Sequence, residues 1–465
     1  MSQASTREND LATKPIGRLL WQLSLPAIAA QVVNLLYNVV DRMYIGHIPG
    51  EGAMALTGVG VTMPLIVLVM AFASLASVGG APRAAIMMGR GKKDDAEKIL
   101  GNCAAGLSIT AVVLTAVLLL FGRKALLMFG ASQETIGYAW DYMSVYAAGT
   151  IAVQYTIGLN PFITTQGFSK ISMCTVLIGA ICNIILDPVF IFLFDMGVKG
   201  AALATILSQA ISAAWVLKFL TGKKTNLKIR RMNLRIQPSV YLPCVALGLA
   251  TFVMQSTESL LSISFNSSLL RYGGDIAVGA MTILTSVMNF ALMPLQGFTQ
   301  GAQPIVSFNF GAGNHKRVGS CYKLLLIVCF SYSTLIWLVA MLAPQVFAMI
   351  FTSDAALTQA TVHALRIYMA VIFMFGLQIA CQQTFVSMGN AKTSLFLALL
   401  RKVFLLIPLI FILPHFFANK VDAVLLAEPV SDFIAVCVTC TLSFRAMRRY
   451  LRRQEENEKP ESSKA

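Results

Sequence analysis

Charged residues are scarce in this sequence of 465 residues. Asp, Glu, Lys and Arg make up 12% of it, about half the roughly 25% of an ordinary soluble domain. Apolar residues reach 57%, and a soluble globule could not hide that much apolar surface. Intrinsic disorder is excluded as well, because disordered chains have low hydrophobicity. The composition therefore indicates a polytopic membrane protein.

Signatures of enzymes are also missing. The segment Gly89–Lys93 lacks the GxxxxGK[ST] spacing of a phosphate-binding loop. The nine cysteines are expected to be small buried hydrophobes, and their one CxxC spacing, at Cys437 and Cys440, lies in an apolar run. No Ser or Cys pairs in a hydrolase pattern with the four histidines, which are His47, His315, His363 and His415. We expect no enzyme, no bound cofactor and no ATP hydrolysis, so any pumping would use an ion gradient.

Long apolar runs fill most of the chain. A transmembrane helix needs ~20 apolar residues, and runs of this length are too long for barrel strands. The polar N-terminal segment has no short apolar run with a cleavage site, so a cleaved signal peptide is not expected. The predicted fold class is all-α, with twelve transmembrane helices at 16–46, 53–80, 97–121, 135–158, 171–194, 198–219, 238–268, 276–301, 318–342, 356–386, 393–415 and 420–445.

Positive charge exceeds negative charge, with 36 Lys and Arg against 21 Asp and Glu. Binding of nucleic acid would require one exposed basic face, but the basic residues stand in short clusters between the apolar runs. With an internal N-terminus, 29 of them fall on the inner side and 7 on the outer side. Basic residues favour cytoplasmic loops. We therefore predict a plasma (inner) membrane protein with both termini in the cytoplasm and no nucleic-acid partner.

The two halves of the chain repeat weakly at an offset of 222 residues. Pro82 corresponds to Pro304, and Gly89 corresponds to Gly311. Parallel repeats are typical of transporters with two lobes around a cavity that opens alternately to each side. The predicted organisation is a tail (1–15), an N-lobe (16–219), a basic cytoplasmic linker (220–237), a C-lobe (238–445) and a second tail (446–465). A channel is the competing interpretation, although a channel would more often be a smaller oligomeric subunit. We expect a monomer.

Carboxylates at membrane depth are few and point to function. Asn183 and Asp187 share one helix face at i, i+4. Thr205 and Asp41 are expected at a similar depth in the outer half of the N-lobe. Two carboxylates, an amide oxygen and a hydroxyl suit Na⁺ or a shared proton. These four residues are the predicted cation-coupling site, and the same set would hold a Na⁺ ion.

Several further polar residues are candidates for a substrate cavity. Asn34 and Asn38 continue the polar stripe of Asp41 and suit either ligand contact or contact between helices. Glu258, with Gln255 beside it, could hold a second ion or attract a cationic substrate, and we slightly favour the second role. Asp141 and Tyr142 lie nearer the outer end of their helix.

Two more features of the predicted helices bear on conformational change and on the C-lobe. Pro26 should kink the first helix. Glu428 and Asp432, at i, i+4 on the last helix, are further candidates for a functional role, and packing between helices or a polar network is the structural alternative.

These motifs resemble the MATE (multidrug and toxic compound extrusion) transporters. Tyr37-Asn38-Val-Val-Asp41 followed by Tyr44-Ile45-Gly46 resembles the first-helix signature of the family, and its YNVVD form is closest to MepA-like bacterial members. The loop that starts at Gly89 and ends at Ala96 resembles the family's G-x-G-x-x-x-x-A loop. Asn183, Asp187 and Thr205 resemble the first-lobe cation site of the DinF-like branch.

The resemblance implies six plus six helices, V-shaped lobes and antiport of organic cations against Na⁺ or H⁺. It gives the coupling role to Asp41, Asn183, Asp187 and Thr205. Glu258 matches an acid on helix 7 of the NorM-like branch, but the acid of that branch on helix 10 is missing, which favours coupling in the first lobe. A flippase for lipid-linked glycans is the alternative from the same superfamily. It would need a cationic cavity, and the scarcity of intramembrane Arg and Lys argues against it.

Overall fold

The long apolar runs of the sequence fold into long helices. The computed structural model describes residues 10–351 and 355–458, and within these residues it contains helices and no strand. The first half holds α2 (Ile16–Gly46), α3 (Gly52–Gly89), α4 (Lys93–Met128), α5 (Ile136–Ala148), α6 (Thr150–Thr165), α7 (Ser169–Pro188), the π-helical turn η1 (Val189–Leu193) and α8 (Gly197–Thr221).

The second half begins after a short 3₁₀ turn, η2 (Arg231–Leu234). It holds α9 (Pro238–Gly311), α10 (His315–Leu342), α11 (Pro344–Phe351), α12 (Ala355–Tyr368), α13 (Ile372–Ser387), α14 (Ala391–Leu399), the π-helical turn η3 (Leu400–Leu406), α15 (Ile407–Ile412), η4 (Leu413–His415) and α16 (Lys420–Glu458).

The predicted twelve-helix architecture is confirmed, although several spans are interrupted. Nine helices of the described residues are long and apolar enough to cross a membrane. One of them, α9, contains two spans because Gly274 breaks its helical geometry (φ 64°, ψ −161°). Another span is made of α12 and α13, which meet at a bend of 52°. The fourth predicted span is divided into α5 and α6 at Gly149.

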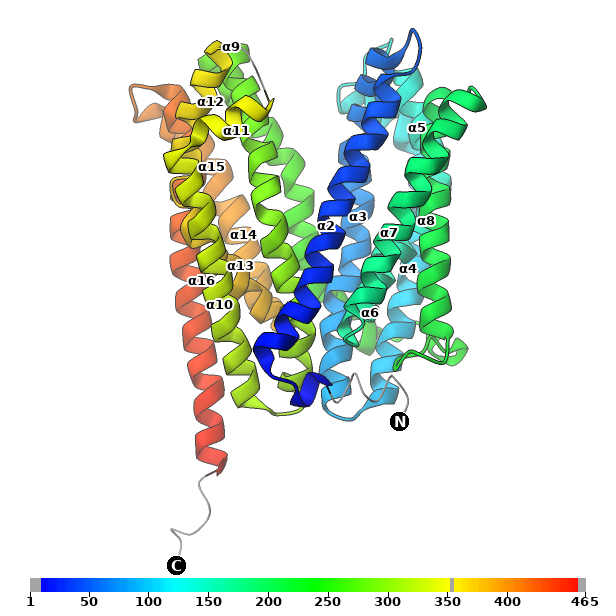
Figure 1. The fold of residues 1–465 in the computed structure, drawn as a ribbon, viewed down its shortest axis with the longest axis vertical. Helices are drawn as coiled ribbons and strands as arrows, with labels where there is room; N and C mark the ends of the chain where they lie inside the picture. Colours follow the sequence, from blue (N-terminus) through cyan, green and yellow to red (C-terminus); the bar gives the residue numbers. More distant parts are fainter. Residues whose placement is uncertain (1–9, 352–354, 459–465) are drawn as a thin grey trace, which may run out of the picture.

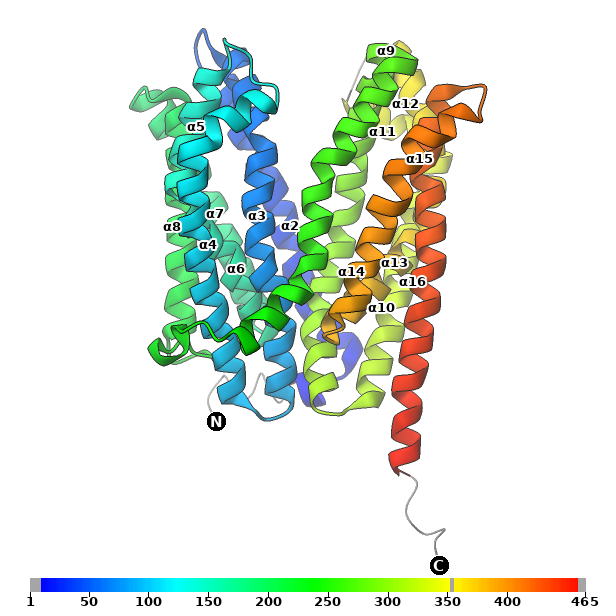
Figure 2. The ribbon, with the colours of Figure 1, turned by 180° about the vertical axis from the view of Figure 1, so that it is seen from behind.

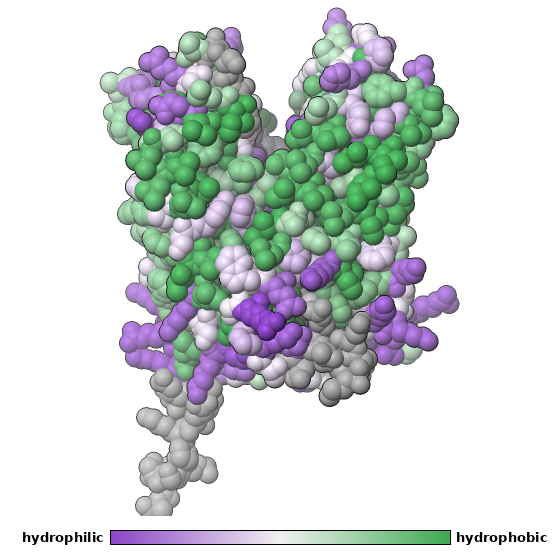
Figure 3. Space-filling view, in the orientation of Figure 1, coloured by the Kyte–Doolittle hydropathy of each residue, from purple (hydrophilic) through white to green (hydrophobic). Residues whose placement is uncertain are grey.

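The helices form two lobes, an N-lobe of α2–α8 and a C-lobe of α9–α16. Figures 1 and 2 show the lobes in contact at the end where the chain termini lie and diverging toward the opposite end. Figure 3 shows an open cleft between them at that opposite end, with hydrophobic surface on both lobes beside the cleft and below it. The hydrophobic surface fits a lipid bilayer, and the cleft gives water a path into the middle of the protein.

The core explains why the lobes join at one end only. One buried apolar cluster draws on both lobes and includes Leu20, Leu100 and Phe298. Two further clusters belong to single lobes, around Phe265 in the C-lobe and around Met143 in the N-lobe. The shared cluster therefore holds the lobes together near the termini, while the other two stabilise each lobe separately.

Two glycines allow the lobes to approach at backbone contact. A Cβ atom on Gly89 would lie 2.0 Å from the carbonyl oxygen of Phe308, and one on Gly311 would lie 2.0 Å from that of Ile86. Only glycine tolerates such an approach. The offset of 222 relates Gly89 to Gly311 and Ile86 to Phe308, so each contact is the repeat counterpart of the other.

The segment between the lobes is attached to the N-lobe. The side-chain oxygen Oε1 of Gln166 accepts hydrogen bonds from the backbone nitrogens of Asn226 (2.7 Å) and Leu227 (3.0 Å). The buried carboxylate of Glu97 forms an ion pair with Arg230. These contacts fix where the chain enters the C-lobe.

Candidate functional site

The centre of the N-lobe site is a pair of carboxylates on neighbouring helices. Asp41 on α2 is 8% exposed, and Asp187 at the end of α7 is fully buried. The two carboxyl groups are close enough to interact electrostatically. One oxygen of each, Oδ1 of Asp41 and Oδ2 of Asp187, has no hydrogen-bond partner. Two carboxylates in contact repel each other unless a proton or another cation lies between them.

Asn183 and Thr205 complete the oxygen set that the sequence predicted. Asn183 Nδ2 donates to Asp187 Oδ1 (3.1 Å) and lies 3.5 Å from Thr205 Oγ1 on α8. The Oδ1 atom of Asn183 is buried and has no partner. The structure thus brings together all four predicted coupling residues, with three buried oxygens left free to bind a cation.

Tyrosines surround this site. The Tyr142 ring stacks on Tyr146 at 6.3 Å, and its hydroxyl is in electrostatic contact with Asp41. Tyr37 lies one turn before Asp41 on α2 and is in electrostatic contact with it. Sequence reasoning placed Tyr142 in the substrate cavity and missed Tyr37, although the i, i+4 spacing from Asp41 was a usable signal.

The other predicted residues of the N-lobe lie outside the carboxylate pair. Asp141 forms an ion pair with Lys199 (3.4 Å), and both side chains are about half exposed. Asn38 is exposed and donates to the carbonyl oxygen of Asn34 (2.6 Å). Pro26 is buried inside α2, which runs without a break from Ile16 to Gly46.

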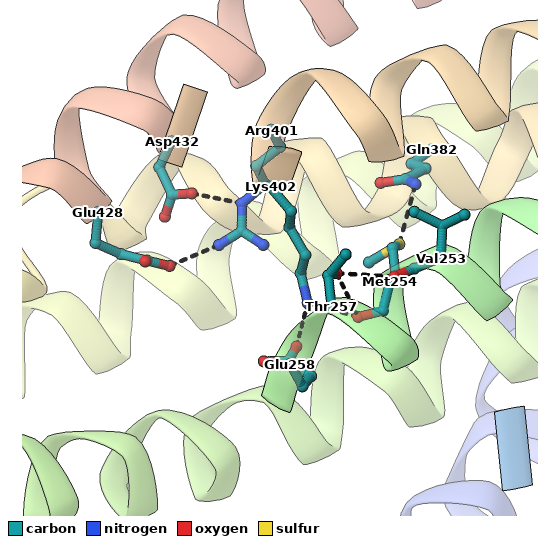
Figure 4. Close-up of polar contacts among 9 residues, drawn as sticks. All are labelled: Val253, Met254, Thr257, Glu258, Gln382, Arg401, Lys402, Glu428 and Asp432. Carbon is teal, nitrogen blue, oxygen red and sulfur yellow. Dashed lines mark hydrogen bonds and ion pairs between the residues drawn. The ribbon is translucent and has the colours of Figure 1, made fainter. Parts of the chain in front are cut away.

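A second polar cluster lies in the C-lobe, and Figure 4 shows it. Arg401 in η3 binds two carboxylates of α16, with Nη2 at 2.8 Å from Glu428 and Nε at 2.6 Å from Asp432. All three side chains are at most 9% exposed. The guanidinium also stacks over the ring of Phe375 at 4.4 Å. For Glu428 and Asp432, the structure therefore supports a polar network.

Lys402 extends this cluster toward the cleft. Its ammonium group forms an ion pair with Glu258 and donates to the carbonyl oxygen of Met254 (2.9 Å). The Lys402 side chain is 4% exposed, whereas that of Glu258 is 61% exposed. Gln255, next to Met254, is partly buried.

Glu258 belongs to a polar face of α9. Glu258, Ser262 and Asn266 are exposed and lie four residues apart, so they share one face of the helix. In Figures 1 and 2, α9 lies on the side of the C-lobe that faces the cleft. Glu258 therefore lies on an exposed polar face of α9, with the buried Lys402 behind it.

The prediction for Arg401 and Lys402 was wrong. Their charges were counted among the cytoplasmic basic residues, but the structure buries both inside the helical span that runs from Ala391 to His415. Their acidic partners on α9 and α16 make this burial tolerable. Basic residues inside one predicted span and acids at i, i+4 in the next were the available signal.

The N-lobe site suits a cation with oxygen ligands. Across residues 10–351 and 355–458, no group of three or more His, Cys, Asp or Glu side chains is arranged to hold a metal. The Asp41–Asp187 pair has only two such groups, supplemented by amide and hydroxyl oxygens. Hard cations such as Na⁺ prefer oxygen ligands, and a proton can be shared by two carboxyl groups.

Comparison with known proteins identifies relatives along almost the whole chain. The MatE family model matches residues 26–189 and 250–412. "Multidrug export protein MepA" of Staphylococcus haemolyticus (strain JCSC1435) is 22% identical over 92% of this chain and 94% of its own length. The protein of the same description from Staphylococcus aureus (strain N315) is 24% identical over 93% and 95%. A solved structure described as a ligand complex of the MATE multidrug transporter DinF-BH is 34% identical, with a TM-score of 0.85 over 93% of this chain and 96% of that one.

Proposed function

The chain belongs to the MatE family of membrane transporters, and from that premise we propose that it exports organic cations in exchange for Na⁺ or H⁺. The observation that carries the proposal is the buried Asp41–Asp187 pair, whose free oxygens have no basic partner. The nearby Arg42 is exposed and directs its guanidinium to Met63 Sδ (3.6 Å). The pair therefore needs a cation from solution, which is what a coupling site requires.

The coupling cycle follows from the repulsion within this pair. With both termini in the cytoplasm of a bacterial cell, the cleft opens to the outside. An external Na⁺ or H⁺ enters the oxygen set of Asp41, Asn183, Asp187 and Thr205, neutralises the carboxylates and changes the packing of α2 around Pro26. This change favours release of the substrate and closure of the outer cleft. Exchange is coupled because ion and substrate favour different states.

The names of the relatives support the class of substrate. The staphylococcal proteins are described as multidrug exporters, and DinF-BH is described as a multidrug transporter. We extend this to organic cations for the present chain because the carboxylate of Glu258 is 61% exposed on a polar face of α9 and attracts positive charge. The transporter works as a monomer in the plasma membrane and uses no bound cofactor besides the transported ion.

A flippase for lipid-linked glycans is the less favoured alternative. A pyrophosphate group would need unpaired basic residues in the cleft. Arg401 and Lys402 lie at membrane depth, but three carboxylates neutralise them. Neither residue therefore offers a free positive charge to an anionic lipid.

The proposal is tested in proteoliposomes with a fluorescent organic cation. Transport of the dye is measured under an imposed Na⁺ gradient and then under a pH gradient. We expect at least one gradient to drive transport, and the Asp41→Asn and Asp187→Asn variants to lose it. Asp141→Asn is the matched control, because this acid is exposed and paired with Lys199. Gradient-driven transport by both coupling variants would contradict the proposal.

A further inference from the structure

A groove of about 470 Å³ lies between α10 and α16 on the C-lobe. Figures 1 and 2 show the two helices side by side toward the end of the molecule where the chain termini lie. Part of the groove lining is apolar and consists of Leu326, Phe444, Met447 and Leu451. The groove therefore offers an apolar surface outside the cleft between the lobes.

Direct contacts hold α10 and α16 together along this groove. The Tyr322 hydroxyl lies 2.8 Å from Ser443 Oγ, and both side chains are buried. The ring of Tyr322 also meets the ring of Phe444 edge-on, with the centroids 6.3 Å apart. A Cβ atom on Gly319 would lie 3.3 Å from Leu451 Cδ2, so the glycine leaves room for this leucine. The walls of the groove are therefore fixed by packing.

Three basic side chains line the groove without acidic partners. Lys323, Arg448 and Arg452 are exposed, and none of them forms an ion pair among the described residues. The helix α10 contains no acidic residue. No Asp or Glu stands three or four positions from Lys323 or Arg448, where a helix would place a partner. The groove thus presents positive charge that the protein itself does not neutralise.

The surroundings of the groove place it at the edge of the membrane. The apolar span of α16 ends at Arg452. Phe444, one turn before Arg448, is 51% exposed, and Ile327, one turn after Lys323, is 61% exposed. Figure 3 shows hydrophilic surface at this end of the molecule, next to the hydrophobic surface of the lobes. In a membrane, such apolar side chains face acyl chains, whereas basic side chains near the ends of spans reach the headgroups.

We propose that the groove between α10 and α16 binds one anionic phospholipid from the leaflet on the side of the termini. The headgroup phosphate lies among the ammonium group of Lys323 and the guanidinium groups of Arg448 and Arg452. Guanidinium groups bind phosphate with charge-assisted hydrogen bonds, and basic pockets between transmembrane helices suit anionic headgroups. An acyl chain covers Leu326 and Phe444. The bound lipid contacts both helices and stabilises their packing.

Two neighbouring arginines of α16 provide a matched control. Arg445 and Arg449 are exposed and form no ion pair among the described residues, but they do not line the groove. Replacing both removes two charges from the same end of the molecule, as does replacing Lys323 and Arg448. The two double variants therefore separate a lipid site from a general attraction of basic residues to anionic membranes.

The test is a lipid titration of the purified full-length protein in neutral detergent. Native mass spectrometry counts the lipids retained as phosphatidylglycerol or phosphatidylcholine is added. We expect wild type to retain one phosphatidylglycerol, with phosphatidylcholine bound at least tenfold more weakly. The Kd for phosphatidylglycerol should rise at least tenfold in Lys323→Gln/Arg448→Gln and less than twofold in Arg445→Gln/Arg449→Gln. Circular dichroism checks that both variants keep their helices.

A competition experiment distinguishes a lipid from a free anion. Inorganic phosphate and glycerophosphoglycerol carry negative charge but no acyl chain, so neither should displace the retained phosphatidylglycerol. Displacement by either compound at concentrations near the Kd of the lipid would contradict the role of the apolar lining.

Three results of the titration would overturn the proposal. They are unchanged affinity in the groove variant, equal losses in both double variants, and equal affinity of wild type for the two lipids. None of the basic residues belongs to the cation-coupling set, so the titration is independent of the proposed function. A protein without gradient-driven transport would still show whether the lipid site exists.

Discussion

The buried carboxylates of the two lobes differ in their partners. In the N-lobe, Asp41 and Asp187 face each other without a basic partner. In the C-lobe, Arg401 binds two acids and Lys402 binds a third. Both clusters are built on equivalent halves of one repeat. One lobe therefore carries its own cations, whereas the N-lobe pair has no ion-pair partner within the described residues.

This difference assigns separate tasks to the lobes. A buried ion pair whose cation is covalently attached is satisfied in every state, and it cannot exchange with a gradient. A carboxylate pair with free oxygens changes charge whenever a cation enters or leaves. The N-lobe is therefore suited to energy coupling. The C-lobe offers a fixed framework, with Glu258 as its exposed acid on α9.

Removing either carboxylate of the N-lobe pair should have the largest effect. Asp41→Asn or Asp187→Asn takes away the charge that the coupling ion neutralises, so gradient-driven transport should fall by about 100-fold, the upper range of typical coupling energies. Initial rates in proteoliposomes measure the loss. The unfolding temperature should stay constant or rise, because a repulsive charge is removed. The Glu258→Gln variant should still transport in response to the gradient. Loss of this response would contradict the proposed difference between the two lobes.

Removing Arg401, which is the cation of the buried C-lobe cluster, should lower the stability of the protein rather than its coupling. Arg401→Met leaves Glu428 and Asp432 buried without a partner, which costs about 3–5 kcal/mol and should lower the melting temperature in detergent by roughly 5 °C or more. The variant that also carries Glu428→Gln and Asp432→Asn should recover most of the loss. An unchanged melting temperature in Arg401→Met would show that this cluster is not a structural counterpart of the coupling site.

Lys402→Met should change the affinity for substrate more than the coupling. Glu258 is well exposed and would lose its ion-pair partner, so an organic cation could use the whole carboxylate charge. We expect the apparent KM for the organic cation to fall by about tenfold. This corresponds to ~1.4 kcal/mol of binding free energy after solvent screening. Transport against substrate concentration measures the change. Adding Glu258→Gln should reverse it, and a higher KM in Lys402→Met would contradict this role.

The smallest effect is expected from Thr205→Val. This change keeps the shape of the side chain but removes one of the oxygens near Asn183. One neutral hydrogen-bonding group contributes about 0.5–1 kcal/mol, so the concentration of coupling ion at half-maximal rate should rise about two- to fivefold. Titration of the transport rate with Na⁺ or H⁺ checks this. If the half-maximal concentration shifts for neither ion, Thr205 is not part of the coupling site.

Local patterns in the sequence predicted which polar residues of the N-lobe lie together. The i, i+4 spacing of Asn183 and Asp187 fixes their common face, and span lengths give their depth, so the meeting with Asp41 could be inferred. The C-lobe cluster could not, because its contacts join distant helices. Lys402 meets a residue 144 positions earlier in the chain, and no local pattern records such a pairing. The count of basic residues on each side of the membrane placed Arg401 and Lys402 in the cytoplasm because it does not see their acidic partners.

The sequence did not predict where the helices are interrupted, for a similar reason. The breaks at Gly149 and between α12 and α13 lie inside apolar runs. Composition reports that such a run can span a membrane but says little about where it bends. Packing against neighbouring helices decides the bend, and that information is spread over the whole lobe.

The most direct test of coupling in the N-lobe is a count of cations released when substrate binds. Purified protein in weakly buffered solution is saturated with an organic cation, while a pH indicator and a Na⁺ electrode record release. We expect release of about one monovalent cation per protein by wild type, and none by the Asp41→Asn/Asp187→Asn double variant. The Arg401→Met/Glu428→Gln/Asp432→Asn variant should release as much as wild type. Undiminished release by the N-lobe double variant would contradict the central claim.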